Sequence, residues 1–187
     1  TARVDKFLVP VQGSTENLWL ALVFGEATIF CILAAILRRH GANVYAATAC
    51  ACAVVWQLAG YQNLPSETYT VLYAILGLVL LAVSRLFGTH QVKTFLASGG
   101  QSSTLIGRGT AAFHSATALL SLAFLSCFLQ GLARLSTTVQ WPHLTALLIT
   151  TTAGLVAAAL SPSSIWRRIY VAWSIALGCV VFRTPNV

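Results

Sequence analysis

The sequence predicts an all-α fold: a polytopic transmembrane bundle of about six helical spans with a hairpin-repeat organisation. Hydrophobic residues make up 57% of the 187 residues and charged residues only 8%, whereas a soluble domain carries about 25% charged residues. Six continuous apolar runs each approach the roughly 20 residues that cross the hydrocarbon of a bilayer. Prolines and basic residues stand at the ends of these runs. We therefore expect one transmembrane domain over residues 1–187.

The first three spans are predicted at residues 17–37, 42–60 and 68–86. The first is the run "LWLALVFGEATIFCILAAIL", which ends at the basic pair Arg38 and Arg39. The second ends before the turn sequence "YQNLP". The third follows Pro65, and Glu67 precedes its first turn. A proline and an acidic side chain are both favourable at a helix start, where amide hydrogens have no partner.

The last three spans are predicted at residues 110–132, 142–160 and 166–182. The fourth follows a long connection, residues 87–107, whose second half is rich in Gly and Ser and is typical of a flexible linker. The fifth begins at Pro142 and ends before Pro162, which cannot continue a helix. The sixth begins at Trp166.

Two other fold classes fit the sequence less well. A transmembrane β-barrel predicts alternation of apolar and polar residues, whereas these runs are continuous and rich in Leu and Ala. A soluble bundle of buried helices needs a polar shell, and the chain has too few charges to build one. The net charge of +7 is distributed over several loops, so we expect no nucleic-acid partner.

The basic residues predict how the chain is threaded. Alternate threading places seven of them on one side, namely Arg38, Arg39, Arg85, Lys93, Arg108, Arg167 and Arg168. Four fall on the other side, namely Arg3, Lys6, Arg134 and Arg183. Cytoplasmic loops carry the excess of Lys and Arg. The sequence therefore predicts a multi-pass protein of the bacterial cytoplasmic (inner) membrane with both ends of the chain facing outward.

A weak internal pattern predicts repeated hairpins. Arg39, Arg108 and Arg167 are each followed six residues later by an aromatic or His residue and a small residue, and "ATA" recurs at 47–49 and 116–118. Each unit would be a basic inner anchor, an outgoing helix, a short loop and a returning helix. The second span would then pair with the third, and the fourth with the fifth. The first and last spans would lack partners, so we expect the chain to be a fragment of a longer protein.

The stretch "VVWQLAGYQNLPSETYTVLYAILGL" at 54–78 carries an aromatic residue and Gln before the outer turn, a helix start with Pro and an acidic residue, and a Leu-rich return. It resembles hairpins in large, uncharacterised bacterial membrane proteins built from repeated transmembrane pairs. The resemblance implies membership of a larger membrane protein and implies no catalytic residue.

Glu26 lies near the centre of the first span. A carboxylate near the bilayer midplane costs a few kcal/mol, so we expect Glu26 either to be protonated or to face the bundle and find donors on other spans. The possible intramembrane polar site comprises this residue and groups that could reach it from other spans: Glu26, Thr48, Ser121, Thr151, Ser174 and His114. It could be a proton relay or a substrate site. Alternatively, Glu26 holds helices together and the hydroxyl groups bond their own backbone.

The sequence shows no set of nucleophile, base and acid, so no catalytic residue is predicted and an enzyme is not favoured. The histidines do not share one depth, and Cys50 and Cys52 lie about 200° apart on a helix, so no cofactor or metal site is predicted. We expect a structural or scaffolding module of a larger polytopic protein or membrane assembly. Its partners would be the lipid bilayer and other subunits or the rest of a longer chain. The alternative is a small transporter or permease that uses Glu26.

Overall fold

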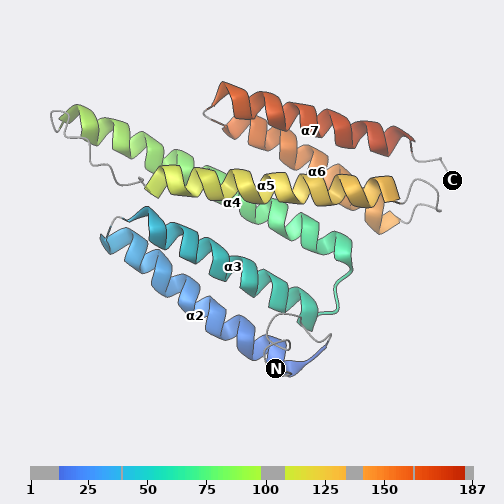
Figure 1. Cartoon of the computed structure of the whole chain (residues 1–187), viewed down its shortest axis with the longest axis horizontal. Coiled ribbons are helices and arrows are strands. Elements are labelled where there is room, and N and C mark those ends of the chain that lie inside the picture. Colours follow the sequence, from blue (N-terminus) through green and yellow to red (C-terminus); the bar gives the residue numbers. More distant parts are fainter. Residues whose placement is uncertain (1–12, 39, 98–107, 134–140, 162, 184–187) are drawn as a thin grey trace.

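The computed structural model describes residues 13–38, 40–97, 108–133, 141–161 and 163–183. These residues form six helices and no strand (Figure 1). The helices are α2 (Thr15–Arg38), α3 (Gly41–Tyr61), α4 (Ser66–Ala97), α5 (Arg108–Ala133), α6 (Trp141–Leu160) and α7 (Ser164–Arg183).

The helices confirm the predicted fold class. Each predicted span lies within one helix. Four segments are long and apolar enough to cross a membrane: Thr15–Arg38, Gly41–Tyr61, Glu67–Leu86 and Gly109–Leu132. The apolar part of α6, Leu144–Leu160, is shorter.

Helix α4 is longer than predicted. It continues to Ala97, through a stretch that the sequence analysis assigned to the connection at 87–107. The end of this stretch, "QVKTFLA", contains neither Gly nor Pro, and the first pair of helix-breaking residues is Gly99-Gly100. The helix therefore runs on until shortly before that pair.

The helices pack most extensively in consecutive pairs: α2 with α3, α4 with α5, and α6 with α7. Figure 1 shows the α4–α5 pair between the other two pairs. The predicted hairpin units instead joined the spans that became α3 and α4, and those that became α5 and α6, and these helices contact each other less extensively. The internal repeat itself stays a prediction.

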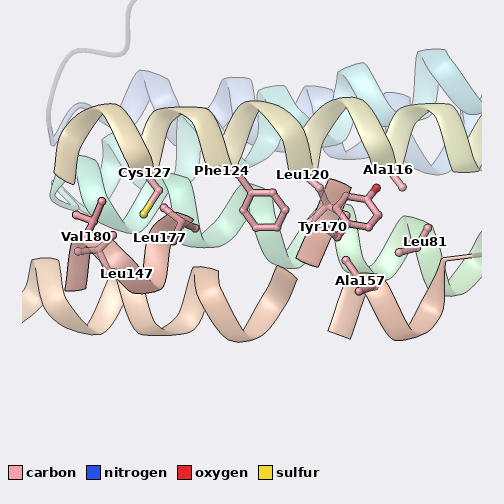
Figure 2. Packing of buried hydrophobic residues seen from close by; sticks show 11 residues of the cluster. Leu81, Ala116, Leu120, Phe124, Cys127, Leu147, Ala157, Tyr170, Leu177 and Val180 are labelled. Atoms are coloured by element: carbon pink, nitrogen blue, oxygen red, sulfur yellow. The ribbon is translucent and has the colours of Figure 1, made fainter. Parts of the chain in front are cut away.

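The buried core lies among α4, α5, α6 and α7 (Figure 2). Its members are Leu81, Ala116, Leu120, Phe124, Cys127, Leu147, Ala157, Ala158, Tyr170, Leu177 and Val180. At its centre the rings of Phe124 and Tyr170 meet edge to face, with centroids 6.2 Å apart. Among the described residues, α2 and α3 contribute nothing to this cluster. The α2–α3 pair is therefore attached to the side of the core.

The turn between α3 and α4 shows why α3 ends where it does. Asn63 has a positive φ of 51°, and its N–H donates to the carbonyl of Gly60 at 3.3 Å. The N–H of Leu64 donates to the carbonyl of Ala59 at 3.0 Å. These two bonds form a Schellman motif. Pro65 follows directly, so α4 starts where the sequence predicted a helix start.

The opposite end of the bundle holds a cluster of basic residues. Arg85 of α4 donates from Nε to the carbonyl of Leu160 and from a terminal nitrogen to that of Ala159, at 3.4 Å. Arg167 donates to the carbonyl of Ser161 at 3.4 Å. The last carbonyls of α6 have no partner within that helix, so a guanidinium there is favourable. We call this end of the bundle, where Arg85 and Arg167 lie, the basic end. Arg3, Lys6, Arg39 and Arg134 lie outside the described residues.

Gly154 of α6 lets α7 approach closely. A Cβ built at Gly154 would clash with Ser174 Oγ and lie 3.4 Å from Phe124 Cζ. Ser174 is fixed in turn, because its hydroxyl donates to the carbonyl of Tyr170 at 2.9 Å. Gly178, one turn further along α7, would meet nothing within 4 Å. The two glycines therefore differ in packing although both lie inside helices.

We expect Gly154→Ala to destabilise the fold and Gly178→Ala to leave it unchanged or slightly more stable. The methyl group at 154 must displace Ser174, and overpacking of this kind costs about 1–3 kcal/mol. Thermal unfolding of both variants in the same detergent measures the difference. Equal midpoints for the two variants would contradict the α6–α7 contact.

A second stability test concerns Tyr170, which is fully buried and whose hydroxyl has no hydrogen-bond partner among the described residues. Tyr170→Phe keeps the ring and removes an unsatisfied polar group, so we expect equal or higher stability. Tyr170→Ala leaves a cavity and should cost about 3 kcal/mol or more. A thermal midpoint that falls as far in the Phe variant as in the Ala variant would show that the hydroxyl has a partner.

Candidate functional site

Glu26 lies in the middle of α2 and its side chain is exposed. The buried residues of α2 include Asn17 and Ala35. Each is nine residues from Glu26, which is about 2.5 turns of an α-helix. Glu26 therefore lies on the side of α2 opposite to the one that packs on α3, whereas the sequence analysis expected it to face the bundle.

Large apolar side chains surround Glu26 on this outer face. Phe30 is 73% exposed and Trp19 is 69% exposed. Leu22, Ile29 and Leu33 are also exposed. Helix α2 makes its extensive contact with α3, and no described residue gives the Glu26 carboxylate a hydrogen bond or an ion pair. We call these six residues the outer face of α2. In this face one carboxylate lies among side chains that suit lipid or another helix.

Three of the four hydroxyl residues of the predicted polar site hydrogen-bond within their own helices. Thr48 donates to the carbonyl of Val44 at 2.9 Å, and Thr151 donates to that of Leu147 at 2.8 Å. Ser174 bonds Tyr170, as described above. Ser121 is half-buried on α5. These residues are not gathered around Glu26. Hydrogen bonds from these hydroxyl groups to their own helix backbone are expected if the groups do not form a proton relay.

His114 joins α5 to α3. Its Nδ1 lies 3.2 Å from the hydroxyl of Tyr45, and its imidazole contacts Phe113, with ring centroids 6.2 Å apart. Both members of the hydrogen bond are exposed. Tyr45 lies in the first half of α3 and His114 in the first half of α5. The bond therefore fastens the α2–α3 pair to the core in the half of the bundle nearer the basic end.

A cavity that sequence reasoning missed lies between α3, α4 and α5. It has a volume of about 670 Å³ and is lined by aromatic and uncharged polar groups, among them Trp56, Tyr69, Tyr73, Ser126 and Gln130. The rings of Trp56 and Tyr69 meet edge to face at 5.3 Å. No pattern in the sequence indicates this cavity, because a linear pattern does not show which helices diverge.

A second, apolar cavity of about 360 Å³ lies between the α2–α3 pair and helices α4 and α5. Thr28 and Thr48 are its only lining residues with a polar side chain, and each bonds its own backbone. Glu26 lines neither cavity. The carboxylate and the cavities are therefore separate features.

The described residues offer no group of three or more His, Cys, Asp or Glu side chains that could hold a metal ion. The five cysteines are free thiols. Comparison with protein-family models, curated proteins and solved structures gives no match. The arrangement of this chain's own residues is therefore the basis of any functional proposal.

The position of Glu26 predicts how the isolated chain responds to substitution. Glu26→Ala removes an exposed group without a partner in the described structure, so we expect a change within about 0.5 kcal/mol in dilute detergent. Ala21→Leu, on the buried side of α2, should cost about 1–3 kcal/mol by overpacking. Thermal unfolding at a low protein-to-detergent ratio measures both. A large loss in Glu26→Ala would instead place Glu26 between helices of one chain.

Proposed function

We propose that this chain is an integral membrane module with a structural or scaffolding role in a larger polytopic protein or membrane assembly. The outer face of α2 carries the proposal: it is apolar, it is not covered by the other described helices, and it has one carboxylate at its centre. The seven-to-four distribution of basic residues supports a place in the bacterial cytoplasmic membrane with both ends of this chain outward.

Exposure of large apolar residues alone is uninformative in a membrane, because lipid tails are as apolar as Leu. Glu26 differs from its neighbours. An acidic side chain at the centre of a transmembrane helix costs a few kcal/mol, and such residues almost always face a protein interior or a water-filled cavity. Glu26 lines neither of the two cavities described above. A partner segment on the outer face of α2 would supply the missing protein surroundings.

The alternative function, a small transporter or permease that uses Glu26, needs a polar route to this residue. The larger cavity is lined by α3, α4, α5 and the α3–α4 turn, and Glu26 is directed away from α3. The geometry therefore favours assembly over transport through Glu26.

The proposal is tested by a photo-crosslinking amino acid placed at Phe30 in the protein as it is expressed in its own membrane. We expect a covalent adduct with a protein segment, because assembly would cover the outer face of α2. The matched position is Leu155 of α6, which is also a largely exposed apolar residue. We expect Leu155 to give mainly lipid adducts.

Lipid adducts alone from Phe30, at the same yield as from Leu155, would contradict the proposal. Phe30 lies next to Glu26 on the exposed side of α2. The crosslinked product therefore identifies what covers the carboxylate.

A further inference from the structure

We propose that the partner on the outer face of α2 is the α2 of a second copy of this chain, with the two Glu26 side chains facing each other on a two-fold axis. This inference rests on the proposed assembly function. It adds the identity of the partner, the packing register and the role of the carboxylate.

The first observation is the spacing of the exposed residues. Thr15, Trp19, Leu22, Glu26, Ile29 and Leu33 are all exposed, and the steps between them alternate between four and three residues. This is the heptad spacing of a left-handed pair of helices, in which a and d positions line the contact. The seam runs along the centre of the side of α2 that is opposite to α3.

The second observation is the place of Glu26 within that seam. If Leu22 and Ile29 occupy d positions, Glu26 occupies an a position midway along the helix. A single polar residue at an a position fixes the register and the number of strands in a coiled coil. The other charged residues of α2, Glu16 and Arg38, fall outside the a and d positions. Apart from Thr15 at the first residue of the helix, the seam therefore holds one polar side chain, and a shifted register would leave Glu26 against apolar side chains.

The third argument concerns symmetry. Two copies threaded the same way through one membrane are related by an axis along the membrane normal, so their α2 helices run parallel. In a two-fold contact the same patch serves both copies, and a residue on the axis meets its own equivalent. A carboxylic acid suits this position, because in its neutral form it carries both a donor and an acceptor. Two neutral Glu26 side chains can therefore hydrogen-bond each other.

Arg38, Arg167 and Arg168 lie near helix ends, and Arg85 lies at the end of the apolar span Glu67–Leu86. Arg85 and Arg167 bond carbonyls at the basic end, so these four residues are not at the depth of Glu26. If α2 packed on a different face of a second copy, Glu26 would therefore have no charged partner there. The contact between two α2 helices gives each carboxyl group a hydrogen-bonding partner and covers the apolar seam.

The test is energy transfer between donor- and acceptor-labelled copies of the protein in liposomes, over a series of protein-to-lipid ratios. We expect the wild type and Glu26→Gln to associate with similar affinity, because an amide also carries a donor and an acceptor. Glu26→Ala should weaken association about 5- to 30-fold, given the strength of hydrogen bonds between helices in membranes. Leu155→Ala on α6 is the matched control and should associate like the wild type.

A photo-crosslinking amino acid at Leu22 or Ile29 reports the interface directly. We expect a product of twice the chain's mass that contains two differently tagged copies, whereas Phe24, on the other side of α2, should give no two-copy product. Crosslinks from Leu22 and Ile29 to a different protein segment would overturn the second-copy inference and leave the assembly function standing. Lipid adducts alone would overturn both. Association of Glu26→Ala equal to that of the wild type would overturn the role of the carboxyl pair.

Discussion

Four segments of this structure are long and apolar enough to cross a membrane, and the constraint that hydrocarbon places on polar groups governs the rest of the structure. In hydrocarbon a polar group must find its partner within the protein. Several threonine hydroxyl groups meet this requirement locally: Thr28, Thr48 and Thr150 each donate to the carbonyl four residues earlier, at 2.7, 2.9 and 2.7 Å. A hydroxyl can reach its own helix in this way. The carboxylate of Glu26 has no such bond in the described structure.

The same constraint allows small residues at buried positions and large apolar residues at the surface. On α5 the buried positions include Ala111, Ala112 and Ala116, whereas Leu122 and Leu129 are exposed. In water this arrangement would leave the larger apolar surface in contact with solvent. In lipid, burial of Leu brings little gain, and helices associate through close packing of small residues. Gly154 against Ser174 is the tightest example in the described helices. Packing here depends on shape more than on the amount of apolar surface.

The sequence was sufficient to predict the helices and insufficient to predict their faces. Length and hydropathy located all six helices, and Pro65 marked the start of α4 because a proline restricts the backbone wherever it stands. The direction of Glu26 was not predictable in the same way. An amphipathic helix reveals its buried side by periodicity, but the central turns of α2 are apolar except at Glu26 and Thr28. The expectation that Glu26 faces the bundle considered only helices of the same chain as its partners.

Helix pairing was also beyond the sequence, because it depends on which surfaces fit. Once the pairs are known, the position of α2 explains how a costly residue can persist. Helix α2 lies outside the cluster formed by α4 to α7, so its outer face is not constrained by the packing of the core. A carboxylate on that face contributes nothing to the fold of one described chain, and in lipid it costs free energy. We propose that its contribution comes from contact with another protein segment, and the alternating spacing of four and three residues around it fits a second helix packed along this face.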